Sequence, residues 1–302
     1  MSSYWSQYWQ QGHLTSFGDD FSGNYTGVLK ALWEELFQQI PNGQKVLDIG
    51  TGNGSLIALG QDVNAHLVYT GLDSAKLSIP DSLSNLTNMT FIEEAQAEKM
   101  PVSDSAFDYV ISQFGIEYSS LSDSVPEVCR ILKTGGHFQF ILHDCESAIV
   151  KPNLAILNAA KALIASGLIE TIRKLINALA KYGQKSSICE QLRHQLNAEI
   201  GNIANKHASA LAGTGFPAFL KHVMQPNLAL KQKKQDLKLF LTELEGQIVR
   251  LSDLVSAALT DEKYDQLKTL LTENQLDIVS DESIFEENKL IGRRISGIKA
   301  SN

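Results

Sequence analysis

The stretch from Asp48 to Gly54 holds the residues of this 302-residue chain that are best suited to ligand chemistry. It reads Asp-Ile-Gly-Thr-Gly-Asn-Gly and follows a short apolar run that begins at Lys45. Glycines let the backbone turn sharply and let a ligand approach the main chain closely. A helix expected after the turn offers unpaired N–H groups at its start. The stretch therefore predicts a ligand-binding turn between a strand and a helix.

Two classes of nucleoside ligand use such a turn. A dinucleotide site has the pattern G-x-G-x-x-G, with the pyrophosphate on the helix N-terminus. Here Gly54 comes one residue early, and Ser55 stands where that pattern has its third glycine. Asp48 would repel a diphosphate but suits a ligand with a cationic amino-acid end. These features favour a nucleoside with an ammonium group, and an NAD-type oxidoreductase is the second interpretation.

The elements that must position this turn form an alternation of strands and helices. Strands are separated by helices, which indicates a parallel sheet covered on both faces, with ligands beyond the carboxyl ends of its strands. Expected strands cover 45–49, 66–72, 90–92, 107–112 and 137–142, the last after a turn at 135–136, and expected helices cover 25–40, 55–60 and 125–132.

Five further polar or aromatic residues fall at the same edge of the expected sheet. Asp73 ends the second strand, Glu117 and Tyr118 follow the fourth, and His143 and Asp144 end the fifth. His143 and Tyr118 are the candidate catalytic residues. His143 can serve as a general base toward a substrate hydroxyl or amine, or it can be a contact that only shapes the site.

The turn resembles motif I of the class I S-adenosylmethionine-dependent methyltransferases, D-x-G-x-G-x-G. In that family an acid placed like Asp73 binds both ribose hydroxyls. Residues 96–101 resemble the adenine-binding loop, 130–137 the turn before the fifth strand, and 290–299 the final antiparallel strand, with 276–279 as its hairpin partner. The resemblance covers about 40–145 and 263–300.

The resemblance implies a fold, a cofactor and a set of binding residues. The fold is α/β, a Rossmann-like, seven-stranded, mostly parallel sheet with helices on both faces. The cofactor is S-adenosylmethionine, and the product is S-adenosylhomocysteine. No metal is expected. The implied cofactor-binding residues are Asp48, Gly50, Thr51, Gly52, Gly54, Asp73, Ser74, Gln96, Ala97 and Gln113.

Departures from the family pattern exclude some classes of methyl acceptor. The adenine loop has Gln96 where the family usually has Asp. No N/D-P-P-Y motif follows the fourth strand, which argues against amino-methyltransferases of DNA bases and of glutamine, and no Pro-Cys pair supplies a nucleophile for cytosine C5. A small-molecule acceptor is therefore expected, and the alternative is a methyltransferase-fold binding or scaffold protein without catalysis.

The stretch 151–262 reads as an α-helical insertion after strand five. It holds 14 Lys/Arg and 9 Asp/Glu within a chain whose net charge is −8. Apolar residues from Leu237 to Ala258 recur at spacings of four and three, as in a heptad seam. We expect the seam to pack on 154–180, with a coiled-coil homodimer as the alternative. We also expect the insertion to cap the methyl-donor end of the site.

These features divide the chain into three expected parts. Residues 1–40 form an aromatic-rich lid or a flank of the sheet (Tyr4, Trp5, Tyr8, Trp9, Phe17, Phe21 and Tyr25). Residues 41–150 and 263–302 form the cofactor-binding domain, and 151–262 form the helical insertion.

Composition excludes several classes of protein. The acidic balance argues against a general nucleic-acid binder, and no apolar run is long enough to span a bilayer. The first residues lack the pattern of a signal peptide. Cys129, Cys145 and Cys189 fit neither a disulfide framework nor a zinc site. The expected compartment is the cytoplasm.

Overall fold

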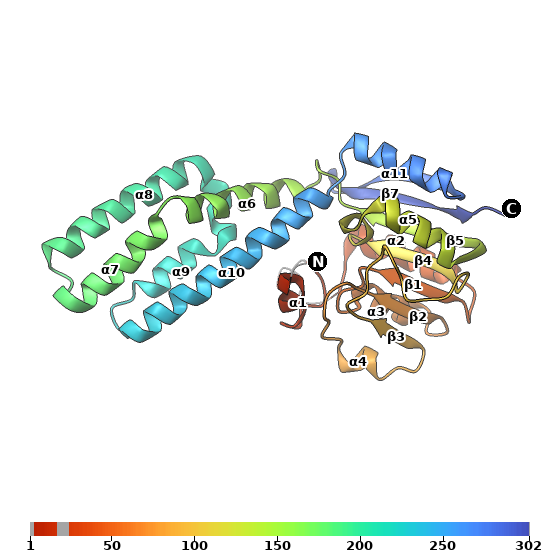
Figure 1. The fold of residues 1–302 in the computed structure, drawn as a ribbon, viewed down its shortest axis with the longest axis horizontal. Coiled ribbons are helices and arrows are strands. Elements are labelled where there is room, and N and C mark those ends of the chain that lie inside the picture. Colours follow the sequence, from red (N-terminus) through yellow and green to blue (C-terminus); the bar gives the residue numbers. More distant parts are fainter. Residues whose placement is uncertain (1–2, 17–23, 302) are drawn as a thin grey trace. The chain divides into compact units, whose positions relative to one another are not determined.

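The computed structural model describes residues 3–16 and 24–301, and these residues form a seven-stranded sheet (Figure 1). The strand order is β3-β2-β1-β4-β5-β7-β6, with β1 to β5 parallel and β7 antiparallel to both β5 and β6. The mostly parallel sheet and its closing antiparallel hairpin are confirmed. The strands are β1 (Lys45–Ile49), β2 (Val68–Leu72), β3 (Met89–Ile92), β4 (Phe107–Gln113), β5 (Leu132–Leu142), β6 (Leu276–Glu286) and β7 (Lys289–Lys299).

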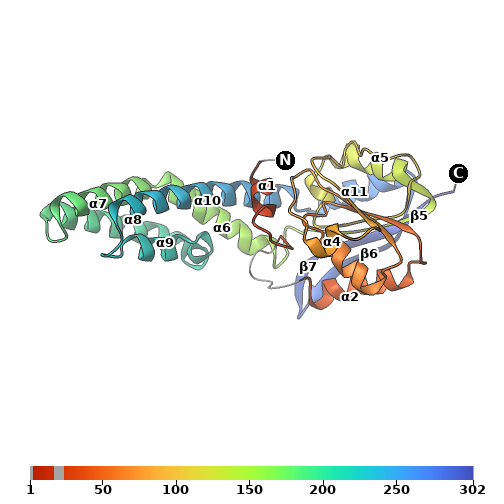
Figure 2. The ribbon, with the colours of Figure 1, turned by 90° about the horizontal axis from the view of Figure 1, so that it is seen from below.

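Helices cover both faces of the sheet. Figure 2 shows α5 and α11 over one face and α2 over the other, where α3 shares a buried cluster with α2. These helices and their neighbours are α1 (Ser3–Trp9), α2 (Gly27–Gln39), α3 (Ser55–Val63), α4 (Asp81–Ser84), α5 (Leu121–Ile131) and α11 (Asp261–Glu273), with a 3₁₀ turn, η2 (Ile116–Tyr118).

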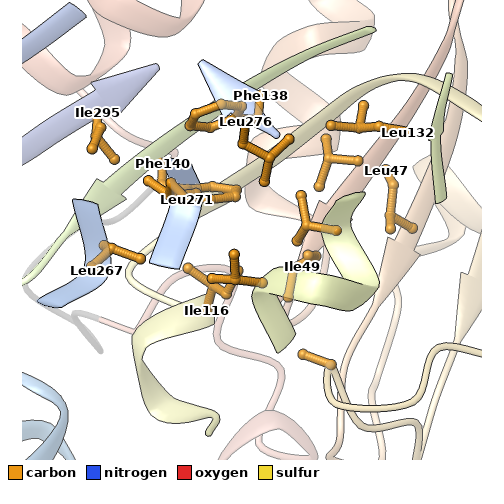
Figure 3. Packing of buried hydrophobic residues seen from close by; sticks show 14 of the residues in the cluster. Leu47, Ile49, Ile116, Leu132, Phe138, Phe140, Leu267, Leu271, Leu276 and Ile295 are labelled. Carbon is orange, nitrogen blue, oxygen red and sulfur yellow. The ribbon is translucent and has the colours of Figure 1, made fainter. Parts of the chain in front are cut away.

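The larger core lies between the sheet and the pair α5 and α11. Leu47 of β1 and Phe140 of β5 meet Leu267 and Leu271 of α11 there, all of them fully buried (Figure 3). Thr260 is the N-cap of α11, and its side chain accepts a hydrogen bond from the Lys263 N–H. The C-terminal segment thus completes the core that holds β1, the strand before the glycine turn.

Two local expectations about this sheet were wrong. The turn expected at residues 135–136 lies inside β5, which starts at Leu132. Gly135 has a φ of +74°, and the pairing of β4 with β5 shifts register beside it, so the glycine produces an irregularity within the strand. Helix α5 starts at Leu121 rather than at Val125.

The chain separates into two compact units, 1–150 with 256–302, and 151–255. The second unit consists of helices alone. They are α6 (Val150–Ala165), α7 (Leu168–Tyr182), α8 (Ser187–Leu211), α9 (Phe216–Val223) and α10 (Leu230–Ala257), with a 3₁₀ turn, η3 (Ala212–Thr214).

The first part of the apolar seam, from Leu237 to Ile248 of α10, lies inside this helical unit. Leu237 and Leu244 belong to one buried cluster with Leu168 and Ile172 of α7, and Leu241 packs against that cluster. These apolar side chains leave water when the helices pack, whereas the charged and amide side chains on the other faces of α10 stay in contact with water. This part of the seam therefore has a partner within the same chain.

No single helix among the described residues is both long and apolar enough to cross a bilayer. The bent pair α6 and α7 meets that criterion only when its two helices are joined, by length and composition. Leu163, Leu168 and Ile172 of this pair are fully buried within the helical unit.

Candidate functional site

The candidate site lies where the sheet order reverses. Strand β1 pairs with β2 on one side and with β4 on the other, and such a switch point opens a crevice beyond the carboxyl ends of the strands. Gly50, with φ +73°, follows β1, and Gly115 follows β4. A Cβ atom on Gly50 would lie 2.7 Å from the Gly115 Cα, so the close approach of the two loops requires a glycine there.

The Asp73 carboxylate ties the glycine turn to the loop after β2. Its Oδ2 accepts from the Gly52 N–H at 2.9 Å, and its Oδ1 accepts from the Ala75 N–H at 2.8 Å. Burial raises the pKa of Asp73, which these backbone donors partly counteract. Each carboxylate oxygen has a second lone pair, so the fixed side chain can still accept from a ligand.

Asp48 is buried in the sheet behind the turn, with 2% of its surface exposed. Burial, with the nearby Asp73 charge, raises its pKa to about 7. The nearby Thr51 hydroxyl partly counteracts this rise. By hydrogen-bond geometry, Asp48 Oδ2, Thr51 Oγ1 and Gln113 Nε2 are among the buried polar atoms without a partner in the described residues. Buried polar atoms are rarely left unpaired in native proteins. A polar or cationic group entering here would pair them.

Two adjoining cavities open at this edge and share Gly50, Asp73, Gly115 and Tyr118. One, of about 80 Å³, also contacts Ser74, Gln96 and Ala97. The other, of about 50 Å³, also contacts Trp5, Trp9, Tyr25, Thr51, Ser55, Phe114 and Gln113. Seven of the ten residues expected to bind the cofactor therefore line one or both of these adjoining cavities.

The other three expected residues support that space without lining it. Asp48 lies behind the turn, and Gly52 gives its N–H to Asp73. Gly54 precedes the first residue of α3 in the left-handed conformation, with φ +87°. A Cβ there would meet Leu83 and Phe91, so Gly54 serves the packing of α3.

Helix α1 covers the glycine turn. A Cβ on Gly52 would lie 2.6 Å from the Trp9 ring, and Asn53 Nδ2 donates to the carbonyls of Trp9 and His13 at 2.9 and 2.7 Å. The Lys76 N–H donates to Ser6 Oγ. Of the aromatic residues noted in the sequence, Trp5, Trp9 and Tyr25 reach the site, whereas Phe17 and Phe21 lie outside the described residues.

His143 and Tyr118 occupy different places at the edge. Tyr118 lines both cavities, whereas His143, 4% exposed, lines neither. The His143 ring stacks on Phe114 at 4.1 Å between centroids, and its Nδ1 lies 2.8 Å from Glu117 Oε1. The backbone N–H of His143 donates to the same oxygen. Glu117 thus fixes the end of β5 to η2, a connection that strand spacing alone does not reveal.

No group of three or more His, Cys, Asp or Glu side chains is arranged to hold a metal ion within 3–16 and 24–301.

The comparisons with known proteins find methyltransferases. A family model described as "Methyltransferase domain" matches residues 40–210. A demethylmenaquinone methyltransferase of Chlorobaculum parvum is 33% identical over 125 residues, which are 41% of this chain and 50% of that protein. The ubiquinone/menaquinone biosynthesis C-methyltransferase UbiE of Xylella fastidiosa is 28% identical over 170 residues, 49% of this chain and 67% of that one. The chain spans about half the length of the first of these relatives.

Two solved structures resemble the whole chain more distantly. A SAM-dependent methyltransferase of Methanosarcina mazei is 13% identical, with a TM-score of 0.40 over 89% of this chain and 98% of that one. The YcgJ protein of Bacillus subtilis is 19% identical, with a TM-score of 0.38 over 90% and 98%.

Burial of Asp48 predicts a stability that depends on pH. The folded protein holds this proton with a pKa of about 7, against roughly 3.9 in an unfolded chain. Ionisation therefore costs stability fully above pH 7, and the cost fades as pH falls to about 4. We expect Asp48→Asn to raise the thermal unfolding midpoint at pH 8 and to change it little at pH 4. The exposed Asp62→Asn is the control, and a lower midpoint for Asp48→Asn at pH 8 would contradict this account.

Proposed function

The chain belongs to the class I S-adenosylmethionine-dependent methyltransferases, since their domain model matches more than half of it, and we propose that it transfers a methyl group from S-adenosylmethionine to a small molecule. The observation that carries this proposal is the Asp73 carboxylate, fixed by two backbone N–H groups beside a glycine turn and beside Asp48, a buried acid with one oxygen that lacks a partner among the described residues.

The donor set at the edge fits the three parts of this cofactor. Asp73 would accept from the two ribose hydroxyls, for which one carboxylate with two oxygens is well matched. Asp48, with the unpaired atoms of Thr51 and Gln113, would stabilise the ammonium end. Gln96 and Ala97 would hold the adenine, beside Ser74 in the larger cavity. When bound, S-adenosylmethionine supplies a methyl group on a positively charged sulfur.

Helix α1 would act as a lid in this proposal. Small-molecule sites usually measure roughly 300–1,000 Å³, whereas the two cavities measure about 80 and 50 Å³ while the Trp9 ring covers Gly52. The cofactor therefore needs α1 to shift. Once it returns, Trp5 and Trp9 would exclude water from the reacting groups. Packing of α1 as a fixed flank of the sheet is the alternative.

Methyl transfer mainly requires that the acceptor be aligned with the methyl carbon. Tyr118 is placed to contact the acceptor because it lines both cavities. The Glu117–His143 pair would hold Tyr118 and Phe114 in place from behind. We therefore assign His143 a positioning role.

The acceptor we propose is a small molecule with a flat, quinone-like ring. The named relatives are methyltransferases of demethylmenaquinone and of ubiquinone and menaquinone biosynthesis. The aromatic side chains at the edge, Trp5, Tyr118 and Phe114, suit a flat ring.

The compartment and the oligomeric state are also proposals. We propose the cytoplasm as the compartment, and formation of a homodimer as the alternative role of the helical insertion.

Cofactor binding can be tested on Asp73. We expect S-adenosylhomocysteine to bind in calorimetry and NAD not to bind, which would exclude the oxidoreductase. Asp73→Asn should weaken S-adenosylhomocysteine by about 1.5–3 kcal/mol, the range for a hydrogen bond to a charged group, or roughly tenfold or more. Asp62→Asn should bind like the unmodified protein. An unchanged dissociation constant in folded Asp73→Asn would contradict the assignment of Asp73 as the ribose acceptor.

A labelled-methyl screen over quinols and other metabolites distinguishes catalysis from a scaffold role, because a scaffold transfers no label.

The role of His143 can be tested with two variants. His143→Asn keeps a side-chain donor for Glu117 and removes the imidazole, so we expect kcat to stay within about tenfold. His143→Phe leaves the buried Glu117 without a side-chain donor, so its unfolding midpoint should fall. A general base contributes roughly 10²–10⁴-fold. A loss of that size in folded His143→Asn would make His143 the base instead.

The helical insertion would select the acceptor by capping the methyl-donor end of the site. Strand β5 ends at Leu142 on the ligand edge, and α6 begins at Val150. An insertion of this length far exceeds the dozen or so residues that a crossover needs. Replacing 152–254 with a short Gly/Ser linker should preserve S-adenosylhomocysteine binding and abolish methylation of the acceptor. Full methylation by the shortened protein would refute the cap, and light scattering on both proteins shows whether the insertion dimerises.

A further inference from the structure

The helical unit 151–255 contains a cavity of its own between α7, α8 and α9. Figure 1 shows these three helices together in the helical unit. Its volume is about 660 Å³, within the range of roughly 300–1,000 Å³ for sites that hold small molecules. Most of the surrounding side chains are apolar. They are Leu175, Leu179, Leu196, Ile200, Leu211, Phe216, Leu220 and Met224.

The cavity opens to solvent and is not an enclosed void of the core, because Gln184, Asn197 and Lys221 of its lining are exposed. Leu175, Leu196 and Phe216 are buried side chains, whereas Ile200 and Leu220 are half-buried and therefore reachable from outside. Binding of a hydrocarbon group there would remove apolar surface of both partners from water, which is favourable.

The polar side chains around the cavity are cationic or neutral. Arg193, Lys221, Gln184 and Asn197 contribute to it, and the described lining includes no Asp or Glu. Arg193 is half-buried and donates through Nη2 to the Gln184 carbonyl at 2.9 Å. Lys221 is exposed, with no ion pair to any described residue. The unit as a whole, 151–255, has 14 Lys/Arg against 7 Asp/Glu.

We propose that this cavity binds a monomeric amphipathic molecule with an apolar chain and an anionic end, of the fatty-acid class. The chain would enter among the leucines and Phe216, and Arg193 and Lys221 would pair with the anionic group. The apolar lining favours a hydrocarbon chain. Because Arg193 and Lys221 have no Asp or Glu beside them in the described lining, they favour an anionic head group. Every residue in the argument belongs to the helical unit, so the inference stands apart from the methyl-transfer proposal.

The test uses the full chain and dodecanoate below its micellar concentration. We expect one saturable site in calorimetry, and displacement by dodecanoate of the fluorescent probe 1-anilinonaphthalene-8-sulfonate. Dodecanol has the same chain without the charge and should bind at least tenfold more weakly. Absence of a saturable site, or equal binding of dodecanol, would overturn the proposal.

Matched variants place the site. Ile200→Trp fills the cavity and should weaken dodecanoate at least tenfold, whereas Leu239→Trp, at a residue 57% exposed on α10, should not. Lys221→Glu should weaken binding, and Lys238→Glu, on an exposed position of α10, should leave it unchanged. Undiminished dodecanoate binding by Ile200→Trp would refute this cavity as the site. A dimer in light scattering that Ile200→Trp dissociates, without dodecanoate binding, would instead make this face an interface between copies.

S-adenosylhomocysteine titration of the same variants serves as the independent readout. Its binding should be the same in Ile200→Trp and in the unmodified protein. Loss of dodecanoate binding together with S-adenosylhomocysteine binding would mean that the substitution disrupts the whole chain, and would count against the cavity. A protein that binds dodecanoate and never S-adenosylhomocysteine would retain this inference and lose the proposed function.

Discussion

The Asp73 carboxylate joins the two loops on which the candidate site depends. It accepts hydrogen bonds from the Gly52 N–H of the turn after β1 and from the Ala75 N–H after β2, so it ties together the loops that follow two neighbouring strands. Without it, two backbone donors would be left unpaired at a buried edge, which is costly. The same side chain borders both cavities. A group that fixes the loops and still has free lone pairs can present a rigid acceptor to a ligand.

Beside Asp73, the same edge of the sheet holds a second buried carboxyl group whose ionisation is unfavourable. Asp48 is a buried carboxyl whose pKa is raised to about 7, and its Oδ2 has no partner among the described residues. A cation placed there would stabilise the ionised form and relieve that cost. Sites prepared for a charged ligand are often less stable than they could be. Helix α1 also covers the glycine turn through Trp9, so a ligand must displace this helix to reach the site.

Much of this architecture could be predicted from the sequence where short-range rules decide it. Apolar runs and glycines predicted β1 and the turn at Gly50. The hairpin of β6 and β7 was expected from the resemblance of 290–299 to the family's final strand, although β6 extends to Glu286, beyond the expected 276–279. The turn predicted at Gly135 was wrong because a positive φ is compatible with both a turn and a bulge within a strand. Only the pairing with β4 shows which of the two Gly135 forms. The stacking of His143 behind Phe114 and the cavity beside Ile200 arise from tertiary packing. Residue spacing carries no signal for either.

The most direct measurement of the central claim is the number of protons released when S-adenosylhomocysteine binds. Calorimetry in buffers with different ionisation enthalpies gives that number at each pH. If the ammonium of the ligand lies at Asp48, binding lowers the pKa of this carboxyl from about 7, so protons are released near pH 6 and far fewer near pH 8. Asp48→Asn should abolish the difference between the two pH values. A proton count that does not change with pH, or that Asp48→Asn leaves intact, would contradict the account.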